Sequence, residues 1–137
     1  MIDNRTAPHA ILVLRIVAGV LLLVHAGLKL FVFTPAGTAA FFGSLGLPPL
    51  LAYLSIAWEL ATGSALILGL WPRVAALAGT LTPLGAIATV HGAAGFFFNN
   101  PNGGWEYPAF WIVALVVIAL AGDGSFAFKP TPFLRAK

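Results

Sequence analysis

Four long apolar stretches, at residues 10–33, 50–70, 74–91 and 105–122, constrain the fold of this chain more than any other feature. Each is close to the roughly 17–25 residues that a transmembrane helix needs. Because lipid offers the backbone no hydrogen-bond partners, each stretch is predicted to be helical. Of the 137 residues, 60% are hydrophobic and 8% are charged, whereas soluble domains carry about 25% charged residues. We therefore expect an all-α integral membrane protein with a single domain over residues 1–137.

The connections between these stretches predict an antiparallel bundle of four transmembrane helices. Thr34-Pro35 should end the first helix, because proline cannot continue the hydrogen-bond ladder. The following segment, 36–47, is too short to span and is predicted to lie at the membrane interface between helices one and two. Pro83 falls within the third stretch and predicts a kink there. The fourth stretch, which contains Trp111, is the most lipid-like of the four.

The placement of Lys and Arg predicts the orientation. Cations precede the first stretch, separate the second from the third, and follow the fourth; they are Arg5, Arg73, Lys129, Arg135 and Lys137. The other two connections contain none. The positive-inside rule then places both termini of this multi-pass protein in the cytoplasm. The first stretch is too long, and too polar in its interior, for a cleavable signal peptide.

The remaining composition narrows the partners. The formal net charge is +3 and the cations are clustered at the predicted inner face, so the chain is expected to contact the lipid bilayer and no nucleic acid. The absence of cysteine excludes disulfides, thiol redox chemistry and cysteine-ligated metals. A homo-oligomer and a membrane or periplasmic redox subunit are the protein partners that we consider.

Glu59 is the most informative single residue, because it interrupts an otherwise apolar stretch. A charge at that depth costs about 2.5–3.5 kcal/mol on insertion scales, so it indicates a partner or a function. His25 and Lys29, on the first stretch, are its natural partners. Two interpretations stay open: a proton or ligand role for Glu59, and a structural ion pair with Lys29, His25 or Arg15.

Counting residues along the predicted helices places most of the other titratable groups in the outer half of the membrane. Glu59 should lie within one or two helical turns of the depth of His25, and Lys29 somewhat further out. His91 ends the third stretch on that side and Glu106 opens the fourth, whereas Arg15 lies toward the cytoplasm. We expect Glu59 and His25 to be the catalytic candidates. The binding candidates are Lys29, Arg15, His91 and Glu106.

Several chemistries can be compared on these residues. Haem would need two axial histidines on facing helices, and His25 with His91 meets this requirement only weakly. A metal site needs more carboxylate and histidine ligands at one depth, so none is predicted. A quinone needs less: an apolar slot, a histidine or lysine donor, and a carboxylate to relay protons. His25, Lys29 and Glu59 provide these groups.

The order of several short motifs resembles the DoxX family. Arg15-x3-Gly19 and the His25–Phe31 segment are similar to its first helix. The other matching segments are Phe41-Phe42-x2-Leu45-Gly46-Leu47-Pro48, Glu59-Leu60, Gly69-Leu70-Trp71-Pro72-Arg73-Val74-Ala75-Ala76, Val90-His91 and Asn102-Gly103-Gly104-Trp105-Glu106-Tyr107-Pro108. The resemblance covers residues 11–124; Ala26 stands where many relatives have glycine.

This resemblance implies a four-helix membrane protein. Some members are subunits of quinone-coupled oxidoreductases, and others are oxidoreductases linked to quinone, catechol or oxidative stress. The leading interpretation is therefore a protein of the bacterial inner (cytoplasmic) membrane that serves as the membrane subunit of a quinone-linked oxidoreductase or redox-stress system. The alternative is a non-catalytic subunit, binding a small molecule or acting in transport or assembly, whose buried charges are structural.

Overall fold

The structure, a computed structural model, describes residues 3–132, which are helical apart from their connections. This part of the chain contains no β-strand, only an isolated bridge between Leu70 and Lys129. The elements are α1 (Ala7–Gly27), η1 (Leu28–Val32), α2 (Pro35–Ser44), α3 (Leu50–Leu68), α4 (Pro72–Gly79), α5 (Leu81–Ala86), η2 (Ile87–His91) and α6 (Glu106–Ala121). Of the cations used to predict orientation, Arg135 and Lys137 lie outside the described residues.

Three of the four predicted spans are helical segments long and apolar enough to cross a membrane: Ala7–Val32, Leu50–Leu68 and Pro72–His91. The fourth, Glu106–Ala121, is apolar but has 16 residues. Its rise of about 24 Å is shorter than the roughly 30 Å hydrocarbon core of a bilayer. The prediction of an all-helical membrane protein is thus confirmed for these three segments.

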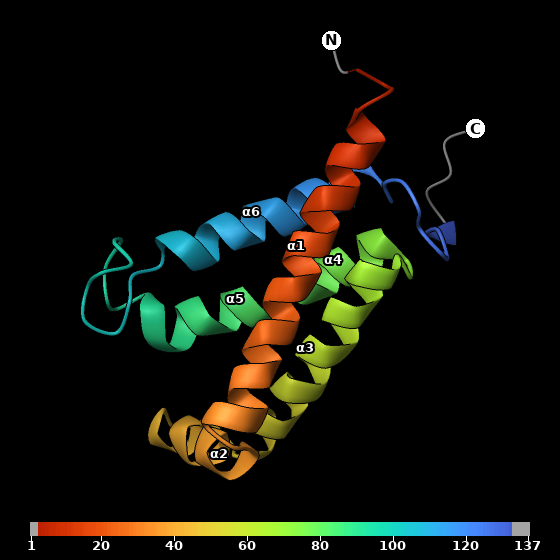
Figure 1. Ribbon diagram of the computed structural model, residues 1–137. Helices are drawn as coiled ribbons and strands as arrows, with labels where there is room; N and C mark the ends of the chain where they lie inside the picture. Colours follow the sequence, from red (N-terminus) through yellow and green to blue (C-terminus); the bar gives the residue numbers. More distant parts are fainter. Residues whose placement is uncertain (1–2, 133–137) are drawn as a thin grey trace.

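α1 and α3 run side by side in opposite directions and meet through glycines (Figure 1). A Cβ added to Gly19 would lie 2.8 Å from the Gly63 carbonyl oxygen, and one added to Gly63 would lie 2.9 Å from that of Gly19. The two backbones therefore touch at this level, as small residues allow between membrane helices.

The third stretch is broken rather than continuous. Pro83 has no amide to donate to Gly79, and its ring clashes with that carbonyl; α4 ends at Gly79 and α5 begins at Leu81. The helix then widens to π-helix at its far end, where Gly92 N–H donates to the Ile87 carbonyl. The same pattern ends the first stretch, where Phe33 N–H donates to Leu28.

The predicted short segment after the first stretch is helix α2. Thr34 ends the preceding helix with a positive φ of 61° and caps α2, its hydroxyl accepting from Gly37 N–H at 3.1 Å. α2 packs against α3 and η1. It lies at the end of the molecule opposite the described ends of the chain (Figure 1). We name these two ends the α2 end and the terminal end.

α6 packs against α1 and α4 and contributes side chains to the buried core. Leu22 of α1, Leu66 of α3, Ala76 of α4 and Leu115 of α6 are buried in one cluster. Trp111 of α6 is also in this cluster and only 4% exposed, so the view of α6 as lipid-like overlooked its buried side. Toward the α2 end, the pair formed by α5 and α6 diverges from the pair formed by α1 and α3 (Figure 1).

Candidate functional site

Glu59 of α3 is held by a short ion pair with Lys29 of η1. Lys29 Nζ lies 2.6 Å from Glu59 Oε1 and donates a second hydrogen bond to Ser55 Oγ at 3.2 Å. Ser55 stands one turn before Glu59 on α3, so both acceptors face the same ammonium group. The side chain of Glu59 is fully buried, whereas that of Lys29 is 19% exposed. Of the three partners considered from the sequence, the structure brings Lys29 to the carboxylate.

One oxygen of this carboxylate is left free. Glu59 Oε2 is buried and has no hydrogen-bond partner among the described residues. Thr82, on α5, lies close to the same carboxylate. A buried acceptor without a partner costs about 1–3 kcal/mol or more. Such a cost at Oε2 is compatible with an atom that takes up a proton or a ligand hydrogen bond.

His25 forms part of an aromatic stack between α1 and α6. Its ring lies 5.1 Å from that of Trp111, centroid to centroid, and Trp111 lies 5.9 Å from Tyr107. The two rings are tilted by 39°, so Trp111 covers one side of the imidazole. His25 precedes Lys29 by four residues, so the two side chains are neighbours on the helix surface.

His91 is positioned by the connection between η2 and α6. Its Nδ1 lies 3.1 Å from the Asn102 carbonyl oxygen and 3.0 Å from that of Gly103. Carbonyls only accept, so Nδ1 carries the hydrogen and Nε2 is the nitrogen left for another partner. Lys29 and His91 both belong to π-helical turns, which are rare and frequently found at functional sites.

Glu106 and Gly104 stabilise the conformation of the loop between η2 and α6. Glu106 Oε1 accepts from Phe98 N–H at 3.1 Å, and its own N–H donates to the Phe96 carbonyl. Gly104 is packed so closely that a Cβ would lie 2.2 Å from the carbonyl oxygens of both Phe96 and Phe97. The segment 92–105 is therefore a defined loop, and it connects His91 to Glu106 at the start of α6.

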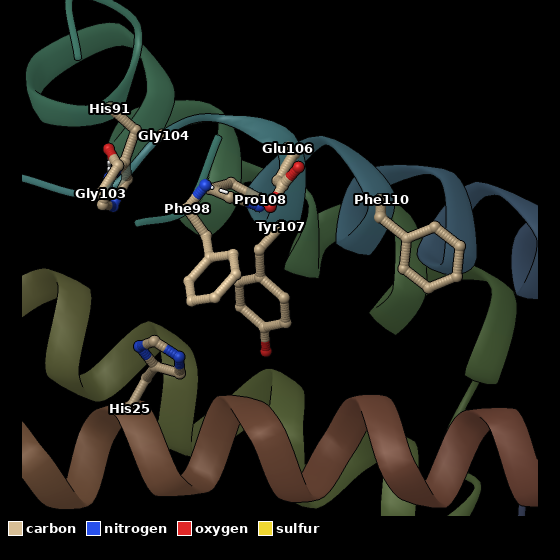
Figure 2. Close-up of a pocket in the computed structure, with 9 residues that line it drawn as sticks. All are labelled: His25, His91, Phe98, Gly103, Gly104, Glu106, Tyr107, Pro108 and Phe110. Carbon is tan, nitrogen blue, oxygen red and sulfur yellow. Dashed lines mark hydrogen bonds between the residues drawn. The ribbon is translucent and has the colours of Figure 1, made fainter. Parts of the chain in front are cut away.

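His25, His91 and Glu106 line a cleft of about 660 Å³ between α1 on one side and η2, the 92–105 loop and α6 on the other. The lining residues are His25, His91, Phe98, Gly103, Gly104, Glu106, Tyr107, Pro108 and Phe110. Figure 2 shows Phe98 and Tyr107 projecting toward α1, with the Tyr107 hydroxyl pointing that way, and His25 projecting from α1 to meet them. The volume lies within the roughly 300–1,000 Å³ that small-molecule sites occupy.

Arg15 is not part of this cleft. It is 1% exposed, lies toward the terminal end, and donates from Nη2 to the Ser125 carbonyl at 3.2 Å. Its Nε and Nη1 have no partner among the described residues. The turn at Gly69 packs on the same guanidinium, since a Cβ there would overlap Nη1. The structure thus separates the predicted set: His25, His91 and Glu106 line the cleft, Lys29 pairs with Glu59, and Arg15 stands apart.

Sequence reasoning did not single out Tyr107, Trp111 and Ser55. Tyr107 and Trp111 are four residues apart on α6, so they lie on the same face of that helix. This spacing could have indicated that both side chains point toward α1. Ser55 stands four residues before Glu59, and it provides the second acceptor for Lys29.

Comparison with known proteins gives one family and one named relative. The DoxX family model matches residues 10–92. A protein of Bacillus subtilis (strain 168), "Putative oxidoreductase CatD", is 35% identical over 134 residues, which cover 98% of this chain and 95% of that protein. No solved structure matches the chain.

Proposed function

This chain belongs to the DoxX family, and we propose that it is the membrane subunit of a quinone-linked oxidoreductase or redox-stress system. The observation that carries the proposal is the cleft, where two histidines, a tyrosine and a carboxylate meet in an otherwise apolar surround. Apolar walls with a few convergent polar groups are typical of small-molecule sites. The name of the B. subtilis relative, an oxidoreductase, supports the same class of reaction.

The groups in the cleft fit a quinone head. When bound, a quinone provides a two-electron, two-proton acceptor whose carbonyl oxygens need hydrogen-bond donors. We assign His25, through its ring nitrogens, and His91, through Nε2, to contact with the head. Glu106 holds the loop that positions His91. Outside the lining of the cleft, Glu59 Oε2 is the atom that would hold a proton, with Lys29, one turn after His25, as its charge partner.

The proposal includes a topology. We place both termini in the cytoplasm of a bacterium, and the cleft on the periplasmic side of the inner membrane, because the lysine and arginine side chains of the connections lie toward the terminal end. α6 completes the membrane domain as a short fourth span of the antiparallel bundle. The chain has no native cysteine, so single cysteines at Asp3 and Asn102 can be tested with a membrane-impermeant thiol reagent. Labelling of whole cells at Asp3 and not at Asn102 would contradict this orientation.

Electrons need a route that this chain does not provide through thiols, since it has no cysteine. We therefore include a membrane or periplasmic redox subunit as partner, and a homo-oligomer as the alternative assembly. Haem ligated by His25 and His91 stays the less favoured cofactor: the carbonyl contacts of His91 Nδ1 leave Nε2 free to ligate, but the two histidines meet the requirement for axial ligands on facing helices only weakly. A Soret band in the purified protein would reverse that preference.

Quinone binding to the purified protein tests the proposal directly. His25→Phe keeps a ring against Trp111 and removes both nitrogens. Loss of one hydrogen bond of about 1–1.5 kcal/mol corresponds to roughly five- to tenfold weaker binding. His9→Phe, at an exposed position of the same helix, is the matched control. Absence of quinone binding by the wild type, or equal binding by His25→Phe, would reject the proposal.

A second candidate function is favoured by the closed Lys29–Glu59 pair. An ion pair at 2.6 Å between two helices is sufficient to fix their register, as in a non-catalytic subunit that binds a small molecule or acts in transport or assembly. The double swap Lys29→Glu with Glu59→Lys distinguishes the two. Retained folding with full function in cells supports the structural role, whereas retained folding with lost function supports proton chemistry at Glu59.

A further inference from the structure

A second, smaller cavity lies between α1 and α6, on the terminal side of the cleft. Its volume is about 100 Å³, and its surface is wholly apolar. The residues that line it are Leu14, Val17, Ala18, Leu21, Tyr107, Phe110, Trp111 and Ala114. On each helix these positions recur every three or four residues, so the cavity follows a groove along the two helices.

The groove continues from the cleft. Tyr107 and Phe110 line both cavities. Trp111 forms a wall of the groove and stacks on His25, which lines the cleft. A molecule in the cleft would therefore contact polar groups at one side and the purely apolar groove at the other. This polar-to-apolar order is the complement of an amphiphile with a ring head and a hydrocarbon tail.

We propose that the groove binds the first part of the hydrocarbon tail of the ligand whose head occupies the cleft. The ligand class is thus a membrane-resident quinone with an isoprenoid or alkyl tail, not a water-soluble ring. A dry apolar cavity of about 150 Å³ can hold benzene, so this one accommodates a smaller group, the tail segment nearest the head. The inference rests on the proposed quinone function and adds which quinones the site selects.

The test measures binding of two quinones that share one head, a dimethoxy-methyl-benzoquinone without a tail and the same ring with a decyl tail. Ala114→Leu fills the groove from α6. Ala61→Leu adds the same volume at an exposed position of α3 and is the matched control. Each ligand is compared between variants in the same detergent, so partition of the tail into micelles cancels.

The expected result is about tenfold weaker binding of the decyl quinone by Ala114→Leu, with binding of the tail-less quinone unchanged and Ala61→Leu like wild type for both. If both quinones bind the wild type but Ala114→Leu weakens neither, or both equally, the groove assignment is wrong while the proposed function stands. If neither quinone binds the wild type, the proposed function is rejected, and this inference with it. Loss of a co-purified phospholipid in Ala114→Leu without change in quinone binding would assign the groove to a lipid chain instead.

Discussion

Removal of Lys29 should destabilise the protein more than removal of Glu59. Lys29→Met leaves the carboxylate of Glu59 fully buried, and it deletes the hydrogen bond to Oε1, while Oε2 has no partner to begin with. Glu59→Gln leaves the ammonium with Ser55 as acceptor and with a side chain that is 19% exposed. The two halves of one ion pair therefore differ in what they leave behind.

The magnitudes follow from this asymmetry. Breaking a buried pair so that a charge is left alone costs about 3–5 kcal/mol. We place Lys29→Met at about 3 kcal/mol, because polar interactions within membranes give smaller values. Glu59→Gln should cost about 1–2 kcal/mol, the scale of one hydrogen bond to a charged group. The double variant should be less destabilised than the sum, with a coupling of about 2 kcal/mol.

Reversible unfolding in mixed micelles, followed by circular dichroism, measures all three free energies of unfolding in one double-mutant cycle. Ser64→Ala, on α3 and outside the ion pair, controls for general sensitivity of this helix. Equal losses below about 0.5 kcal/mol for Lys29→Met and Glu59→Gln would refute the reasoning, because they would mean that the pair is open and solvated in the folded protein.

Three further predictions concern backbone contacts and the terminal end. Gly19→Ala should lower the free energy of unfolding by about 1–3 kcal/mol, because its Cβ would lie 2.8 Å from the Gly63 carbonyl oxygen. The control is Gly27→Ala, where the added Cβ would have no neighbour nearer than 4.0 Å outside the helix backbone. It should leave the free energy of unfolding unchanged or raise it in the same assay. Gly104→Ala should displace the loop of the cleft and weaken quinone binding at least tenfold, whereas Gly27→Ala leaves the titration unchanged. Arg15→Met should loosen residues 123–127, seen as moderately faster proteolysis there under native conditions, because the backbone bonds of Ser125 and Lys129 remain; unchanged cleavage would show that the bond from Arg15 to Ser125 contributes nothing to holding this segment.

Much of this architecture could be predicted because a bilayer limits the options. Apolar length predicted the helices, and the cost of a buried charge predicted that Glu59 would have a partner on the first helix. Depth counting also placed His25, His91 and Glu106 toward one side, and the structure has all three around one cleft.

The remainder depends on geometry that hydropathy does not encode. Pro83 predicted a disturbance of the third helix, but not that the helix would break after Gly79 and end in a π-turn. The α5–α6 pair diverges from α1 and α3 beyond that break (Figure 1), and Trp111 of α6 is buried in the core. A hydropathy pattern cannot distinguish Trp111 in the core from an aromatic residue in lipid, since both environments are apolar.

The contact between Arg15 and Ser125 sets an order of events during biosynthesis. The two residues are 110 positions apart, and at about 5–20 residues per second the ribosome needs roughly 5–20 s to make the intervening chain. During that interval the first helix already carries its arginine, but the carbonyl that accepts from it does not yet exist. The terminal end of this protein is therefore the last part to close, and until then Arg15 depends on water or lipid head groups for hydrogen bonds.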